Sequence, residues 1–117
     1  MKIRIMQPSD YENVYALWNQ TPGMGMRSLD DSYEGILTFL NRNPNTNFVA
    51  EEDRKIVGVI LTGHDGRRGY IYHMAVSQKC RRRGIGKQLL NSALNALSKE
   101  GINKAALVVY ATNELGN

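Results

Sequence analysis

The strongest constraint on the fold is a change of pattern in the second half of the chain. An apolar run at 70–76 is followed by a basic loop that contains Gly84 and Gly86. Beyond this loop the apolar residues recur every three or four positions as far as Leu97, which is the spacing of one face of a helix. The pattern therefore predicts a strand, a glycine loop and a helix over 84–99, in that order.

The loop has the chemistry of a phosphate site. Glycine lets the backbone approach a ligand closely, and the first amides of a helix point outward at the positive end of its dipole. Basic side chains are clustered on both sides of the glycines, at Lys79, Arg81, Arg82, Arg83 and Lys87. So many cations suit a diphosphate better than a single phosphate, because each can make a charge-assisted hydrogen bond.

Two common phosphate sites do not match this loop. A P-loop needs a glycine where Arg81 stands, and a serine or threonine where Gln88 stands. The dinucleotide fingerprint needs glycines at the positions of Arg82 and Leu89. The sequence therefore argues against nucleoside triphosphate, NAD and FAD as ligands.

The loop resembles motif A of the GNAT family of N-acetyltransferases, in which (Gln/Arg)-x-x-Gly-x-(Gly/Ala) wraps the pyrophosphate of coenzyme A. Here the motif reads Arg81-x-x-Gly84-x-Gly86. The resemblance covers nearly the whole chain, and the stretches 63–73 and 113–117 look like a bacterial branch of small members. It implies a mixed α/β sheet with the GNAT acyl-CoA N-acyltransferase-like fold, in a single domain over 1–117 that is truncated at its C-terminus.

The resemblance also implies acetyl-CoA as cosubstrate. The backbone of the strand end, at Met74, Ala75 and Val76, would pair with the acetyl group and the pantetheine arm, and Asn113 matches an asparagine that bonds this arm in relatives. The pyrophosphate would lie on the loop formed by Arg81, Arg82, Arg83, Gly84, Ile85, Gly86 and Lys87.

The reaction implied by the resemblance is direct attack of a neutral amine on the acetyl thioester in a ternary complex. The N–H of Met74 would polarise the carbonyl. The catalytic candidates are His73, Tyr72 and Glu51, of which His73 is the nearest titratable group and Glu51 could act through water. Strand alternation predicts Tyr72 and Met74 on one face and His73 on the other, so they cannot all face the amine. The alternative for His73 is a buried structural histidine.

The rest of the chain predicts alternating strands and helices. Strands are expected at 2–6, 47–51, 55–62 and 104–110, and helices after Ser9 and Ser32. The central strands should form an antiparallel meander, whereas 70–76 and 104–110 should run parallel because a helix connects them. His64 and Asp65 stand between glycines, which favours a hairpin turn over a charged dyad. Asp30 and Asp31 could attract a cationic amine or cap a helix.

Composition limits the possible functions. A chain of 117 residues fits one domain, and its single cysteine, Cys80, excludes an internal disulfide and a cysteine-rich zinc site, so no metal is expected. Without a signal segment or a long apolar run, we expect a cytoplasmic protein with no membrane partner. The net charge of +4 favours acidic partners. A nucleic-acid module is the weaker alternative, because the arginines flank a glycine pair and no aromatic residues are interleaved.

The truncation predicts an exposed sheet edge. GNAT members carry, in a helix beyond 117, an aromatic residue that protonates the departing thiolate. Without that segment the strand at 104–110 has an uncovered edge, so we expect a homodimer. A non-catalytic fragment that binds coenzyme A or only dimerises is the alternative to an enzyme. The acceptor would be an amine of a small molecule or a peptide.

Overall fold

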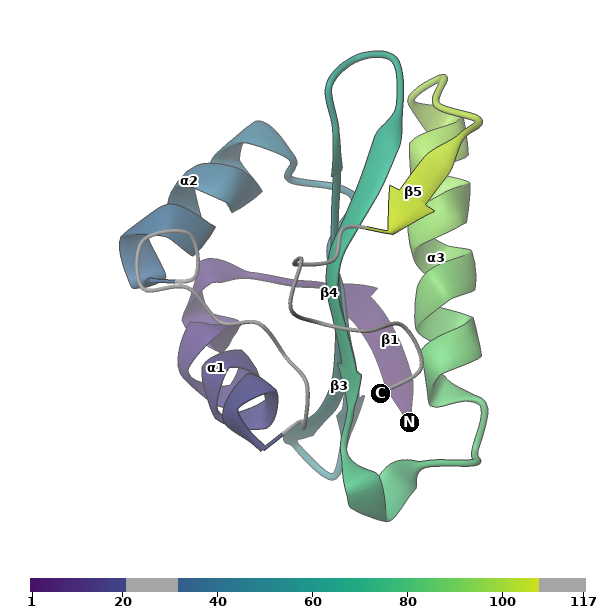
Figure 1. Ribbon diagram of the computed structural model, residues 1–117. Coiled ribbons are helices and arrows are strands. Elements are labelled where there is room, and N and C mark those ends of the chain that lie inside the picture. Colours follow the sequence, from purple (N-terminus) through teal and green to yellow (C-terminus); the bar gives the residue numbers. More distant parts are fainter. Residues whose placement is uncertain (21–31, 108–117) are drawn as a thin grey trace.

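A computed structural model describes residues 1–20 and 32–107 (Figure 1). Its strands are β1 (Lys2–Ile5), β2 (Phe48–Glu52), β3 (Lys55–His64), β4 (Gly69–Val76) and β5 (Ala105–Leu107). Its helices are α1 (Tyr11–Asn19), α2 (Tyr33–Arg42) and α3 (Ile85–Lys99), with single 3-10 turns η1 (Pro8–Asp10) and η2 (Gln78–Cys80). The predicted roles of Asp30, Asp31 and Asn113 and the end of the strand 104–110 lie outside the described residues.

The described strands form one sheet in the order β1-β2-β3-β4-β5. Neighbouring strands from β1 to β4 pair antiparallel, and β4 pairs parallel with β5. The antiparallel meander and the parallel pair joined by α3 are therefore as predicted. β4 and β5 are paired from Gly69 to Ile71, opposite Ala105 to Leu107.

Helices cover both faces of the sheet, with α1 and α2 on one side and α3 on the other (Figure 1). Alternate strand residues supply the two cores, since Val59 packs with α1 and α2 whereas Ile60 packs with α3. On α3 the buried residues recur every fourth position, at Ile85, Leu89, Ala93 and Leu97. The start of α3 is thus fixed against the sheet by Ile85, next to the basic loop.

A β-bulge interrupts the alternation of β4. Leu61 is opposite His73 and Thr62 is opposite Ile71, so Tyr72 is an extra residue without a partner on β3. Ile71 packs with the α3 core, whereas the ring of His73 lies 4.9 Å from that of Trp18 in α1. Tyr72 contacts Phe39 of α2, with ring centroids 5.3 Å apart.

The alternation predicted for Tyr72 and His73 is therefore wrong. One inserted residue shifts the period-two pattern, so both side chains face the helices α1 and α2. Met74 is opposite Ile60 and faces the other side of the sheet.

Buried polar side chains support β3 beside the bulge. The backbone N–H of Thr62 donates to Asn47 Oδ1 at 2.6 Å, and Thr46 Oγ1 donates to the carbonyl oxygen of Thr62 at 2.5 Å. Asn47 Nδ2 also donates to the carbonyl oxygen of Asn43 at 2.8 Å. β2 begins only at Phe48 and does not extend as far as Thr62. The side chains of Thr46 and Asn47 therefore make the hydrogen bonds that a neighbouring strand would otherwise make with the backbone of Thr62.

Candidate functional site

The loop before α3 presents an open helix start. Gly84 is the N-cap residue, with φ 78°, and no side chain caps this end of the helix. Arg82 also has a positive φ, 67°. The first amide that bonds back into α3 is that of Gln88, which donates to the carbonyl oxygen of Gly84 at 3.0 Å. The amides before it point outward, as a helix start that binds an anion requires.

Gly84 is required by its backbone conformation. A Cβ atom placed there would have no heavy atom within 4 Å, so the space is open, but φ 78° is strained for any residue with a side chain. A side chain at this position would enter the space in front of the helix start.

The three arginines of the loop differ in their partners. Arg83 makes a bidentate ion pair with Glu52 at the end of β2, with Nη1 2.9 Å from Oε1 and Nη2 on Oε2. The hydrogen bonds from Arg83 hold the pKa of Glu52 below its usual value. Arg81 and Arg82 are exposed, and no ion pair is seen for them within the described ranges. Arg83 therefore ties the loop to the β2–β3 hairpin, while the other two remain free for an anion.

The structure brings two of the three catalytic candidates together. His73 is 6% exposed and stacked on Trp18, whereas Tyr72, beside it on the same face, is 39% exposed. Burial raises the pKa of the Tyr72 hydroxyl, and the charges of Tyr70 and Asp65 raise it further. The hydroxyl is therefore neutral at physiological pH and can orient an amine, but it cannot act as a base.

Glu51 lies away from this pair. Its Oε1 accepts a hydrogen bond from Nε of Arg4 at 2.8 Å. Glu51 is opposite Ile56 whereas His73 is opposite Leu61, which separates them by roughly 16 Å along β3 at about 3.3 Å per residue.

Two features of the site escaped the sequence analysis. Glu52 reads as a solvated turn carboxylate, yet it is the partner of Arg83, 31 positions away. Trp18 reads as a core residue, and it does pack in the core, but it also covers His73. No local signal indicates either contact, because both depend on how distant segments pair.

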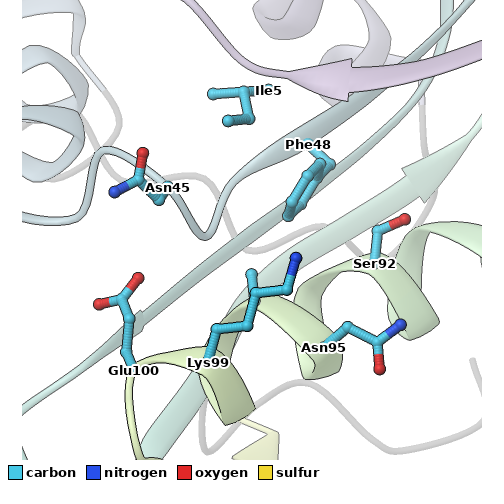
Figure 2. A pocket seen from close by; sticks show the side chains of 8 residues that line it. Ile5, Asn45, Phe48, Ser92, Asn95, Lys99 and Glu100 are labelled. Carbon is cyan, nitrogen blue, oxygen red and sulfur yellow. The ribbon is translucent and has the colours of Figure 1, made fainter.

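A small cavity of about 150 Å³ adjoins the basic loop. It lies between the end of α1 and the segment after β4 and is lined by Leu17, Gln20, Val76, Ser77, Gln78 and Lys79. A larger groove of about 560 Å³ lies elsewhere, between α3 and the strands β1 and β2 (Figure 2). Lys99 and Phe48 point toward this groove, which has no catalytic candidate in its lining.

Residues 1–20 and 32–107 contain neither a metal-binding cluster nor a membrane-spanning helix. No group of three or more His, Cys, Asp or Glu side chains there could hold a metal ion. None of the helices in these ranges is both long enough and apolar enough to cross a bilayer.

Comparisons with known proteins agree with the geometry of the loop and the sheet. The model of the acetyltransferase (GNAT) family matches residues 11–115. The chain belongs to this family. An acetyltransferase of Pectobacterium atrosepticum is 34% identical over 114 residues, which cover 97% of this chain and 79% of that protein.

Solved structures place this GNAT acetyltransferase in the same fold. Ard1 from Thermoplasma volcanium superposes with a TM-score of 0.77 at 25% identity, over 97% of this chain and 74% of that one. PaiA N-acetyltransferase from Thermoplasma acidophilum, in complex with coenzyme A, superposes with a TM-score of 0.78 at 21% identity, over 98% of this chain and 82% of that one. The predicted family, enzyme class and mixed α/β fold are confirmed.

Proposed function

We propose that this protein transfers the acetyl group of acetyl-CoA to a primary amine by direct attack in a ternary complex. The observation that carries the proposal is the uncapped start of α3 behind Gly84, preceded by Arg81 and Arg82, which make no ion pair with the described residues. A structural neighbour in complex with coenzyme A supports it.

In this proposal the loop binds the diphosphate of the cosubstrate. The groups that contact it are the amides and side chains of Arg81, Arg82, Gly84, Ile85, Gly86 and Lys87. Arg83 contributes by holding the loop on Glu52. The pantetheine arm follows the edge of β4, as the resemblance to the GNAT family implies. There it pairs with the backbone of Met74, Ala75 and Val76, and Asn113 is proposed as a further partner.

The chemical step needs an oriented amine, a polarised carbonyl and a proton acceptor. The amine nitrogen forms a bond to the thioester carbon while the N–H of Met74 stabilises the oxyanion. The carbon–sulfur bond then breaks, and coenzyme A leaves as a thiolate. Tyr72 orients the amine through its neutral hydroxyl, and the buried His73 accepts the proton through a water. We assign no step to Glu51, which Arg4 holds.

The test is a calorimetric titration of the chain with acetyl-CoA, combined with an assay of thiol release on simple amines. Gly84→Asp should abolish binding, since it places a side chain and a negative charge where the phosphate lies. The matched control is Gly101→Asp after the other end of α3, where φ is 86° and the space is equally open.

Because Gly84 and Gly101 both have a positive φ, the control shows whether binding is lost through the blocked phosphate site or through the strain of placing a side chain at such a residue. Unchanged affinity in Gly84→Asp would overturn the assignment of the site. Tight binding without thiol release on any amine would favour the non-catalytic alternative. The predicted homodimer is tested on the same sample by light scattering.

A further inference from the structure

A row of aromatic rings lies beside the proposed reaction site and ends at a carboxylate. We call Phe39, Tyr72 and Tyr70 the aromatic wall. The ring centroids of Phe39 and Tyr72 are 5.3 Å apart, and those of Tyr72 and Tyr70 are 6.3 Å apart. The hydroxyl of Tyr70 donates to Oδ2 of Asp65 at 3.3 Å. The wall therefore leads from the bulge to the tip of the β3–β4 hairpin.

Two local features build the aromatic wall. The bulge turns Tyr72 toward α2, beside Tyr70. Gly63, opposite Tyr70, lets α2 approach, because a Cβ atom there would lie 2.8 Å from the ring of Phe39. Tyr72 stays 39% exposed, so the middle of the wall can contact a ligand.

The carboxylate at the end of the wall is ionised and has no ion pair in the described part of the chain. Its Oδ1 accepts the backbone N–H groups of Arg67 and Arg68, both at 2.8 Å. These two bonds hold the pKa of Asp65 below its usual value. The negative charge reaches the middle of the wall, since it helps to raise the pKa of Tyr72.

We propose that the aromatic wall and Asp65 bind a second positive charge of the acceptor, so that the substrate is an amine that carries another cationic group. This inference rests on the proposed function. Tyr70 and Met74 are four positions apart on β4, or roughly 13 Å along the strand, which sets the spacing expected between the second cation and the reacting nitrogen. Aromatic faces attract cations, and the carboxylate adds an ion pair.

The same chemistry has two sources, a linear polyamine and a peptide with a basic side chain near its free N-terminus. The experiment measures kcat and KM for unbranched diamines of increasing length, for monoamines of matched length, and for short peptides with Lys or Gln at the second or third residue. Each acceptor is tested with the parent protein, with Asp65→Asn and with Asp53→Asn. Asparagine keeps the Oδ1 acceptor for the two hairpin amides, and Asp53 is a matched carboxylate in the other hairpin turn.

The parent protein should prefer dications that are long enough to span the wall. Asp65→Asn should lower kcat/KM for them about threefold to fivefold, mainly through KM, because an exposed ion pair is weak. Asp65→Asn should leave kcat/KM for monoamines unchanged, and Asp53→Asn should leave kcat/KM for every acceptor unchanged. Added salt should reduce the preference of the parent protein for dications. Whichever of the diamines and the Lys peptides has the higher kcat/KM with the parent protein identifies the source of the acceptor.

Two negative outcomes are distinguishable. Equal use of monoamines and spanning dications, or an unchanged preference in Asp65→Asn, would overturn this inference and leave the proposed function intact. Failure to bind acetyl-CoA in the same titration would overturn the proposed function, and the inference with it.

Discussion

Replacing Asn47 by alanine should destabilise the fold and misplace the catalytic candidates. The side chain of Asn47 is fully buried and makes two hydrogen bonds, one from the backbone N–H of Thr62 at 2.6 Å and one to the carbonyl oxygen of Asn43 at 2.8 Å. Alanine removes both bonds and leaves a buried donor and a buried acceptor without a partner. Since Thr62 flanks the bulge, the loss acts directly on the position of Tyr72 and His73.

The magnitude follows from the two groups left unpaired. Each unsatisfied buried polar group costs about 1–3 kcal/mol, so we expect the free energy of unfolding to fall by about 2–6 kcal/mol. For a domain of this size a change of 1 kcal/mol moves Tm by about 4 °C, so Tm should fall by roughly 8–24 °C.

The assay is thermal and urea unfolding, followed by circular dichroism, with Asn45→Ala as the control. Asn45 belongs to the same connection but lines the open groove beside α3 (Figure 2). Its loss should change Tm by less than about 2 °C, because exposed polar side chains contribute little. Below its lowered Tm, Asn47→Ala should bind acetyl-CoA with the affinity of the parent, since the basic loop lies at the other end of β4, yet turn over more slowly.

The reasoning would be refuted if Asn47→Ala and Asn45→Ala had the same Tm. It would also fail if Asn47→Ala lost stability but kept the full kcat of the parent at a temperature where it is folded. In that case the polar side chains would stabilise β3 without positioning the bulge.

Two further predictions concern charged groups. Replacing Arg81 and Arg82 together by alanine should weaken acetyl-CoA binding roughly tenfold and flatten its salt dependence. Arg83→Ala should have a smaller effect, equal to that of Glu52→Gln, because each of these two substitutions removes the same ion pair. Calorimetry at two salt concentrations checks this, and an equal loss of affinity in Arg83→Ala would contradict the division of roles. The hydrogen bond from Arg4 holds the pKa of Asp10 below its usual 3.8. The stability from this pair is therefore present above pH 3.8 and is lost as the pH falls through the lowered pKa. The urea midpoints at pH 6 and pH 3 should differ less in Asp10→Asn than in the parent.

The order of the elements could be predicted because its signals are local. The apolar residues that α3 buries recur every fourth position, and Gly84 marks where the helix begins. The connection through a helix is enough to predict that β4 and β5 run parallel. The glycine at the helix start was equally accessible, since the loop residues are contiguous, whereas the binding of a phosphate there stays a prediction.

The division of labour within the basic loop could not be predicted. Arg81, Arg82 and Arg83 are identical side chains in consecutive positions, and no local pattern distinguishes them. Arg83 differs because the β2–β3 hairpin brings Glu52 beside it across the fold. A count of cations in the motif therefore overstates how many are available to the proposed diphosphate, because Arg83 is already paired.

The bulge shows why a catalytic constellation is harder to predict than a strand. An alternating sequence predicts which residues share a face only while the pairing register stays constant. In β4 the register shifts at Tyr72, and the shift is supported by the side chains of Thr46 and Asn47, whose positions in the sequence give no sign of these contacts. A single extra residue thus moves His73 to the face of Tyr72, and the pair that the proposed chemistry requires exists because of it.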